Sequence, residues 1–201
     1  FGLSVRRLIA FFHHKRTYMG RPRPRQAPIG PATGPHGLDG DGGRRQGSAM
    51  MTAKSTPMDL ALGEARLAAE RGEVPVGAVI VDGDTGQVIA AAGNRTEADN
   101  DPTAHAELLA IRHATGNEAR TRLENCDLYV TLEPCAMCAA AISLARIRRL
   151  YFAAYDPKSG GVEHGAKVYE HATCHHRPEV IGGLSESEAA GLLKDFFKGK
   201  R

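Results

Sequence analysis

Two short segments, thirty residues apart in the sequence, carry the residues that most constrain how this chain can fold. The first is His105-x-Glu107 and the second is Pro134-Cys135-x-x-Cys138. One imidazole and two thiolates are suitable zinc ligands, and three protein ligands leave a fourth position free for water, as in catalytic zinc sites. The chain is therefore expected to bring both segments around one Zn²⁺ ion per chain.

The local sequence indicates that both segments begin helices. Cys135 and Cys138 lie three residues apart, so they share one face of a helix, and the proline before Cys135 is typical of a helix start. His105 follows Thr103, a suitable N-cap, and the helix after it is predicted to end at Gly116. Two helix N-termini would then meet at one ion, where their dipoles favour negatively charged thiolates.

Glu107 is predicted to be the catalytic residue. It lies two residues after His105, close enough to the metal to accept a proton from a coordinated water without being a ligand. His-x-Glu followed by Pro-Cys-x-x-Cys resembles the signature of zinc nucleobase deaminases. Their hydrolytic reaction attacks an amidine-like ring carbon, protonates the adjacent ring nitrogen and then protonates the departing amine. One carboxyl group can serve all these steps as general acid and base.

Other interpretations of the cysteines remain open at this point. A Cys-x-x-Cys pair also occurs in thioredoxin-like redox motifs, and Cys126 or Cys174 could complete a structural zinc site. The histidine and the glutamate could also be ordinary buried residues without a metal. Cys126 begins a strand-like segment and is expected to be a small buried residue. Cys174, beside His175 and His176, is expected on a surface loop rather than in a second metal site.

Charge and composition divide the chain near residue 52. Residues 1–50 hold nine of the 26 Lys and Arg residues but two of the 23 Asp and Glu residues, which leaves 17 and 21 for the remainder. Residues 1–52 are dense in Gly, Pro and Arg and are predicted to be a disordered basic extension. Residues 53–201 are long enough for one domain with a well-developed core. Because the domain is mildly acidic, the overall excess of positive charge does not indicate nucleic-acid binding.

The basic extension has two interpretations. A basic start without an acidic residue before Asp39 is typical of a targeting peptide. The chain begins with Phe, however, and Met50 or Met51 directly precedes the globular part, which favours an extension of the gene model. No apolar run reaches the roughly 18 residues that a membrane span needs. Thiolate ligands fit a reducing cytoplasm.

The order of the expected elements favours an α/β fold. A helix is expected from Ser55 or Thr56 to Gly72, with a repeat of Met58, Leu62, Ala65 and Ala69 on its apolar face. Ser185 and Glu188 form a capping box for a last helix, whose apolar side carries Leu192, Leu193, Phe196 and Phe197. The segments expected as strands are 76–82 and 87–93 as a hairpin, 126–132, 148–154 and 178–183. This order predicts a mixed sheet with helices on both faces, and a ligand site where helices follow strand ends.

Residues 57–201 resemble the bacterial tRNA adenosine deaminases, a branch of the cytidine and deoxycytidylate deaminase superfamily. The resemblance is carried by GEVPVGAVIV at 72–81, GNR at 93–95, DPTAHAE at 101–107, LYVTLEPCAMCAAAI at 128–142 and DPKSG at 156–160. It implies a three-layer cytidine-deaminase-like fold with a five-stranded sheet. It also implies hydrolysis of adenosine to inosine at the wobble position of a tRNA anticodon, in a homodimer whose partner helps to form the RNA groove.

The resemblance also assigns roles to individual residues. Zinc is expected on His105, Cys135 and Cys138, with Glu107 as the proton shuttle. Further contacts that it implies are Asn94 with the target nucleoside, Val74 with the base, and Asp156 and Lys158 with the RNA strand.

Two rival functions remain. The first is a deaminase of the same superfamily that acts on a free base, nucleoside or nucleotide, such as cytosine, guanine or deoxycytidylate, with identical zinc chemistry. The second is a zinc-stabilised RNA-binding module without turnover. Glu107 argues against the second, because a purely structural zinc site has no use for a carboxylate that is not a ligand.

Overall fold

A mixed five-stranded sheet forms the centre of residues 55–200, the part of the chain that this computed structural model describes. The strands are β1 Gly77–Asp82, β2 Val88–Gly93, β3 Cys126–Leu132, β4 Arg149–Ala154 and β5 Glu179–Ile181, in the order β2-β1-β3-β4-β5. β1 is antiparallel to β2 and β3, whereas β3, β4 and β5 are parallel. The expected hairpin and mixed α/β sheet are confirmed. The extension predicted for residues 1–52 lies outside the described residues.

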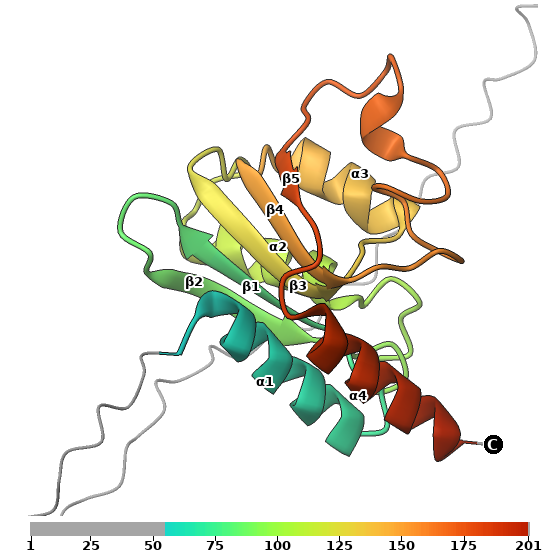
Figure 1. The fold of residues 1–201 in the computed structure, drawn as a ribbon. Coiled ribbons are helices and arrows are strands. Elements are labelled where there is room, and N and C mark those ends of the chain that lie inside the picture. Colours follow the sequence, from blue (N-terminus) through green and yellow to red (C-terminus); the bar gives the residue numbers. More distant parts are fainter. Residues whose placement is uncertain (1–54, 201) are drawn as a thin grey trace, which may run out of the picture. The chain divides into compact units, whose positions relative to one another are not determined.

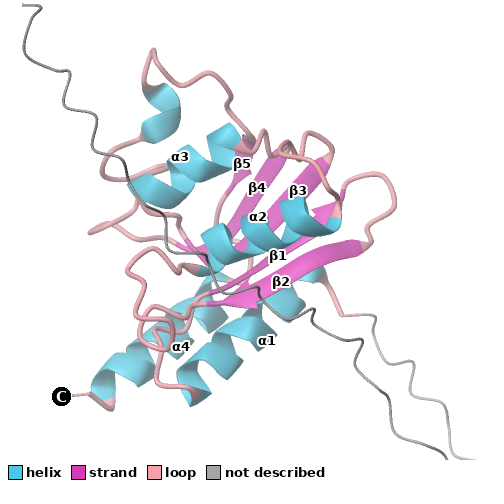
Figure 2. Cartoon of the chain, turned by 180° about the vertical axis from the view of Figure 1, so that it is seen from behind, coloured by secondary structure: helices cyan, strands magenta, loops and turns pink. Residues whose placement is uncertain are grey.

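Helices cover both faces of this sheet, which makes three layers (Figures 1 and 2). α1 and α4 pack side by side on one face, and α2 and α3 lie on the other. A short 3₁₀ turn, η1, contacts α3. The helical elements are α1 Pro57–Glu70, α2 Ala106–Asn117, α3 Ala136–Leu144, η1 Val168–Glu170 and α4 Glu186–Lys198.

The sheet has a hydrophobic core on each of its two faces. Successive strand side chains point to opposite faces, so Ile80 belongs to the core beneath α2 and α3, while its neighbour Val79 packs beneath α1 and α4. Both side chains are fully buried. A strand buried on both faces reads as a continuous apolar run rather than an alternating one, which explains the composition of β1.

Four chain segments meet at one edge of the sheet. β1 begins there, at Gly77 opposite Gly93 at the end of β2, and the parallel pairing of β3 with β4 brings Leu132 and Ala154 to the same edge. The residues that follow β2, β3 and β4 must therefore lie near one another, together with those that precede β1. This edge carries both segments that contain the expected zinc ligands.

The first helix agrees closely with its prediction. Thr56 is the N-cap, and it forms a capping box with Asp59. The helix ends before Gly72, which has a φ of 81°, a conformation that glycine adopts without strain. The predicted repeat was wrong at one position, because Ala68 is buried whereas Ala69 is only half-buried.

Two other helix ends differ from the predictions. The N-cap of α2 is His105 and not Thr103, because the Thr103 hydroxyl donates instead to the Asp101 carboxylate at 2.6 Å. The same helix continues through Gly116 to Asn117, and the following turn contains a left-handed Ala119.

The capping box predicted for α4 is also wrong. Ser185 is the N-cap but has a left-handed backbone, with a φ of 63°, and its side chain makes no capping hydrogen bond. Glu188 instead accepts a hydrogen bond from Arg66 of α1. The apolar face of α4 rests on α1 and β4 through Ala189, Leu192 and Leu193, while Phe197 stays exposed. Along residues 55–200, none of the helices has the length and apolar character that crossing a bilayer requires.

Replacing Ile80 by Ala should destabilise the domain by about 2–5 kcal/mol, because the side chain is fully buried in an interior strand of the sheet and its loss leaves a cavity. Val88→Ala, in the same hairpin but 41% exposed, serves as the control and should change stability by less than about 0.5 kcal/mol. Urea unfolding followed by circular dichroism measures both values. Equal effects of the two substitutions would contradict this assignment of the core.

Candidate active site

A cavity of about 200 Å³ opens at the edge of the sheet where the strand ends meet. It combines residues from before β1, after β2, after β3 and after β4 with the starts of α2 and α3. Its lining residues are Val74, Val76, Asn94, Thr96, His105, Glu107, Leu132, Glu133, Cys135, Asp156 and Ser159. The strand-end position predicted for the ligand site is therefore the position of this cavity.

The three expected metal ligands meet at this cavity. The Nδ1 atom of His105 lies 3.7 Å from the sulfur of Cys135 and 3.5 Å from the sulfur of Cys138. Zinc bonds of about 2.3 Å to sulfur and 2.0–2.1 Å to nitrogen, at a tetrahedral angle, separate the two atoms by about 3.6 Å. The spacing of the three side chains therefore fits zinc, with Nδ1 as the imidazole ligand.

Two helix starts aim these ligands at one point. His105 is the N-cap of α2 and Cys135 is the N-cap of α3, and neither side chain bonds to the free N–H groups of its own helix. Both side chains are therefore available to a metal. The Oδ1 atom of Asn94 accepts the first N–H of α2, from Ala106, at 2.9 Å. Because the positive ends of two helix dipoles face the same place, thiolates are stabilised there.

The surroundings shift the pKa values of the two cysteines in opposite directions. Hydrogen bonds from Cys138 and His105 lower the pKa of Cys135 to about 4, although burial opposes this shift. The hydrogen bond to Cys135 and burial raise the pKa of Cys138, which keeps the shared proton. The pKa of His105 is raised, mainly by its hydrogen bond to Cys135. The cluster therefore suits a divalent cation, which can replace this proton.

Glu107 lies in the first turn of α2, two residues after the imidazole ligand, and is 3% exposed. Burial raises the pKa of its carboxyl group above the ordinary value, although His105 partly opposes this shift. A carboxyl group with a raised pKa can both accept and return a proton near neutral pH. The geometry is thus compatible with a general acid and base beside the cavity.

The expected substrate-contact residues fall into two groups. Val74, Asn94 and Asp156 line the cavity. Lys158 does not line this cavity but lies in a neighbouring groove of about 610 Å³, which also contains Val74 and Asp156. The Oδ1 atom of Asp156 accepts the backbone N–H groups of Lys158 and Ser159 and so shapes the turn that they form.

Two buried carboxylates near the cavity were not predicted from the sequence. Glu73, which is 1% exposed, accepts hydrogen bonds from the Thr96 hydroxyl and from the backbone N–H groups of Glu97 and Ala98. Burial would raise its pKa, but these hydrogen bonds hold the pKa below its ordinary value. Glu133 holds the segment that follows β4 in a similar way. Both glutamates lie in segments that the sequence analysis singled out, at 72–81 and 128–142, but their side-chain and backbone donors lie 23 or more residues away.

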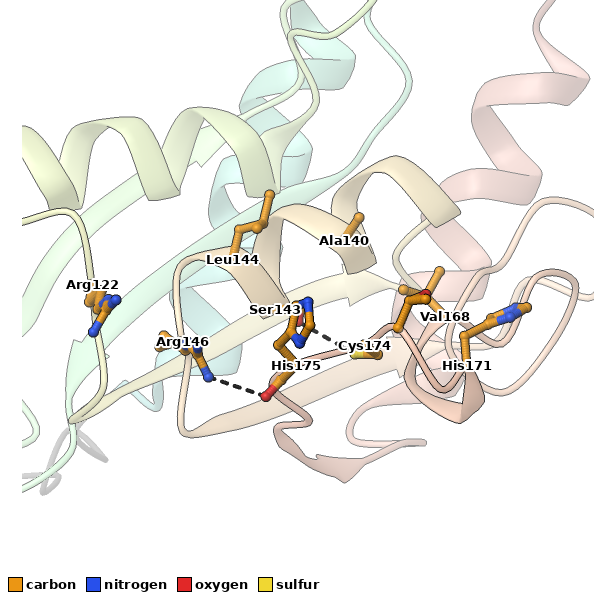
Figure 3. Close-up of a pocket in the computed structure, with 10 residues that line it drawn as sticks. Arg122, Ala140, Ser143, Leu144, Arg146, Val168, His171, Cys174 and His175 are labelled. Carbon is orange, nitrogen blue, oxygen red and sulfur yellow. Dashed lines mark hydrogen bonds between the residues drawn. The ribbon is translucent and has the colours of Figure 1, made fainter. Parts of the chain in front are cut away.

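A separate cavity of about 550 Å³ lies along the outer side of α3 and contains none of the expected zinc ligands (Figure 3). Cys174 lies there, half-buried, 3.5 Å from the Ser143 hydroxyl. Within residues 55–200, the cluster of His105 with its two cysteines is the single group of His, Cys, Asp or Glu with metal-site geometry. The alternative of a structural zinc site completed by Cys126 or Cys174 is therefore wrong. Cys126 is fully buried, as expected.

The family described as the cytidine and deoxycytidylate deaminase zinc-binding region matches residues 51–154. A solved guanine deaminase from Nitrosomonas europaea shares the fold, with 25% identity over 70% of this chain and 82% of its own, at a TM-score of 0.62. Together with the mixed sheet and the His-Cys-Cys cluster, these matches define a zinc-binding hydrolytic deaminase with the cytidine-deaminase-like fold.

Closer relatives specify the branch. A tRNA-specific adenosine deaminase of Agrobacterium fabrum is 57% identical over 151 residues, which are 75% of this chain and 98% of that protein. A solved chain from a study of A-to-I editing by tRNA:A34 deaminases at the wobble position of transfer RNA is 59% identical. It covers 68% of this chain and 98% of its own, with a TM-score of 0.66. The chain belongs to the family of tRNA-specific adenosine deaminases.

Removing one sulfur ligand should release the metal. Cys138→Ala is expected to lower zinc affinity by at least about 100-fold, because losing a direct ligand costs more than losing an outer partner of one. Zinc content after dialysis against a weak chelator measures this loss. Cys126→Ala is the matched control, a buried cysteine outside the cluster, and should keep its zinc. Equal retention by both variants would contradict the ligand assignment.

Proposed function

We propose that this protein hydrolyses adenosine to inosine at the wobble position of a tRNA anticodon. The observation that carries the proposal is the 57% identity with a tRNA-specific adenosine deaminase along 98% of that protein's length. Residues 53–201 are the proposed deaminase domain, which contains the whole candidate site.

His105, Cys135 and Cys138 are proposed to hold one zinc ion per chain. When bound, zinc supplies Lewis acidity, which lowers the pKa of a coordinated water to about 7. Glu107 is the proposed catalytic residue: its buried carboxylate accepts a proton at the cavity wall and passes it to the ring nitrogen of the base. It then takes the proton of the hydroxyl group added to the ring carbon and gives it to the departing amine, while the ring carbon keeps the oxygen as a carbonyl group. The support is its burial at the start of α2, directly beside the imidazole ligand.

Other residues of the cavity and of the neighbouring groove are proposed to bind the base and the RNA strand. Since the Asn94 carboxamide oxygen is engaged by α2, its amide N–H groups are the part available to a nucleoside. Val74 is proposed to pack against the ring, with Asp156 and Lys158 contacting the RNA strand. The cavity is smaller than the roughly 300–1,000 Å³ of most ligand pockets, so it suits one base rather than a folded loop. The target adenine must then be splayed out of the anticodon loop.

The rival function is deamination of a free base, nucleoside or nucleotide. The observation in favour of this rival is the fold that the chain shares with a guanine deaminase. The ligand set and the carboxylate would serve either substrate equally well, so the site chemistry does not discriminate. The groove next to the cavity, which contains Lys158 and Lys200 and the aromatic Tyr155 and Phe197, supports the larger substrate, since cations and aromatic rings bind single-stranded RNA.

The purified chain should convert the wobble adenosine of an anticodon stem-loop to inosine and leave free adenosine, cytosine and guanine almost unchanged. Glu107→Gln should reduce the rate with the stem-loop by more than about 100-fold, because it removes the proton transfer, while zinc stays bound. Chromatography of nuclease-digested RNA measures inosine directly. Glu124→Gln, the same change at an exposed site, is the control. Efficient turnover of a free base with an unchanged stem-loop would refute the RNA assignment.

We also propose that the protein is a homodimer in the cytoplasm. The outer side of α3 supports the first part, because Leu144 is 78% exposed there beside the large cavity of Figure 3. Covering Leu144 and the neighbouring Ala140 and Val168 with a second copy would remove their apolar surface from water. Four free cysteines, two of them expected ligands, support a reducing compartment.

Analytical ultracentrifugation tests the dimer. The wild-type chain should sediment as a dimer at micromolar concentration, and Leu144→Asp should shift it to monomer because a charge would be buried in the interface. Leu67→Asp, at a leucine of α1 that is 47% exposed and lies outside this surface, should remain dimeric. A wild-type monomer, or a dimer that persists in the Leu144→Asp variant, would contradict the proposed surface.

A further inference from the structure

One buried carboxylate holds a whole loop at the rim of the cavity. The side chain of Glu133 is 0% exposed and accepts hydrogen bonds from four residues of the loop 156–164. The donors to Oε1 are the backbone N–H groups of Val162 at 3.3 Å, Glu163 at 2.9 Å and His164 at 2.9 Å. The donors to Oε2 are the backbone N–H of Asp156 at 3.1 Å and the Nδ1 atom of His164 at 2.7 Å.

These contacts use the accepting capacity of the carboxylate almost completely. A carboxylate offers about four lone-pair sites, and five donors already point at them. Although Glu133 borders the cavity, it has no oxygen left for a substrate or for proton transfer. Any effect of Glu133 on the reaction must therefore act through the loop that it holds.

The backbone around Glu133 attaches the same loop to the ligand segment. The N–H of Gly161 donates to the carbonyl oxygen of Pro134 at 2.8 Å, and Gly160 forms an isolated antiparallel bridge with Cys135. The loop therefore lies directly along the residues that lead into α3. A shift of the loop would change the part of the cavity wall that Asp156 and Ser159 form.

The backbone at Gly160 packs directly against the Glu133 carboxylate. A Cβ atom at Gly160 would lie 2.6 Å from the carboxyl carbon of Glu133 and 2.6 Å from the carbonyl oxygen of Asp156. Backbone and carboxylate can approach this closely only because position 160 has no side chain. The His164 imidazole covers the outer side of the carboxylate and is 36% exposed.

From these contacts we infer that Glu133 is a positioning residue for the nucleic-acid substrate. It fixes the turn that carries Asp156, Lys158 and Ser159 at the mouth of the cavity, so that these groups meet the strand in one arrangement. The inference rests on the proposed function for the identity of the substrate. The five hydrogen bonds from the loop 156–164 to Glu133, called the clamp below, are a property of the folded chain whatever the substrate is. Groups that contact the substrate away from the reacting atoms contribute equally to ground-state and transition-state binding, so disturbing them raises KM more than it lowers kcat.

Glu133→Gln tests the clamp with little change in shape. An amide replaces one acceptor oxygen by a donor, so one set of loop donors loses its partner. The full-length zinc-loaded variant should exchange the amides of residues 162–164 at least about tenfold faster in hydrogen–deuterium exchange. With the anticodon stem-loop, KM should rise about tenfold while kcat changes by less than about twofold. Zinc content should equal that of the wild type.

Two further variants supply a control and an independent perturbation of the same contacts. Glu124→Gln makes the same chemical change at an exposed position and should leave exchange and KM unaltered. Gly160→Ala perturbs the clamp from the loop side, with Glu133 intact, and should reproduce the faster exchange and the higher KM even if Glu133→Gln does not fold.

The outcomes separate the two proposals. Unchanged exchange and unchanged KM in both clamp variants would overturn the inference, and so would a fall in kcat at constant KM. Loss of zinc from Glu133→Gln would also overturn it, since Glu133 would then support the metal rather than the loop. If the wild-type chain does not deaminate the stem-loop, the proposed function fails, and the exchange data still decide whether Glu133 holds the loop.

Discussion

The convergence of His105, Cys135 and Cys138 is the constraint on which the arrangement of this protein depends. The imidazole comes from the chain after β2 and the sulfurs come from the chain after β3, so they meet only if both strands end at the same edge of the sheet. The position of β1 between β2 and β3, antiparallel to both, produces that arrangement. Two helices then start at the same place, and their N-termini favour the negative charge of the thiolates.

The walls of the cavity are held by buried carboxylates rather than by apolar packing alone. Glu73 holds the segment after β2, and Glu133 holds the segment after β4. A buried charge is costly unless it is well paired, and here backbone N–H groups supply most of the partners. Loops fixed in this way can present Asn94 on one side and Asp156 on the other with little freedom.

The sequence predicted the parts of this structure that local patterns determine. The hairpin, β3 and the first helix followed from apolar runs, turn residues and the cap at Thr56, and all three agree with the structure. The ligand set followed from chemistry and spacing, and the structure brings its three members together. The family resemblance, rather than the spacing, pointed to RNA as the substrate.

Features that depend on distant partners were missed. Thr103 looked like an N-cap, but the first N–H of α2 bonds instead to Asn94, twelve residues before Ala106. Ser185 and Glu188 had the spacing of a capping box, yet Glu188 pairs with Arg66, which is 122 residues distant. No local pattern shows where the donors to a buried carboxylate will come from.

The measurement that most directly tests the metal centre is X-ray absorption at the zinc edge of the purified protein. The proposed site predicts two sulfur neighbours at about 2.3 Å, one imidazole nitrogen at about 2.0–2.1 Å and one further light atom from solvent. Three or four sulfur neighbours would show that another cysteine completes the coordination. Such a closed site could not activate water, and the account of this protein as a hydrolytic deaminase would be contradicted.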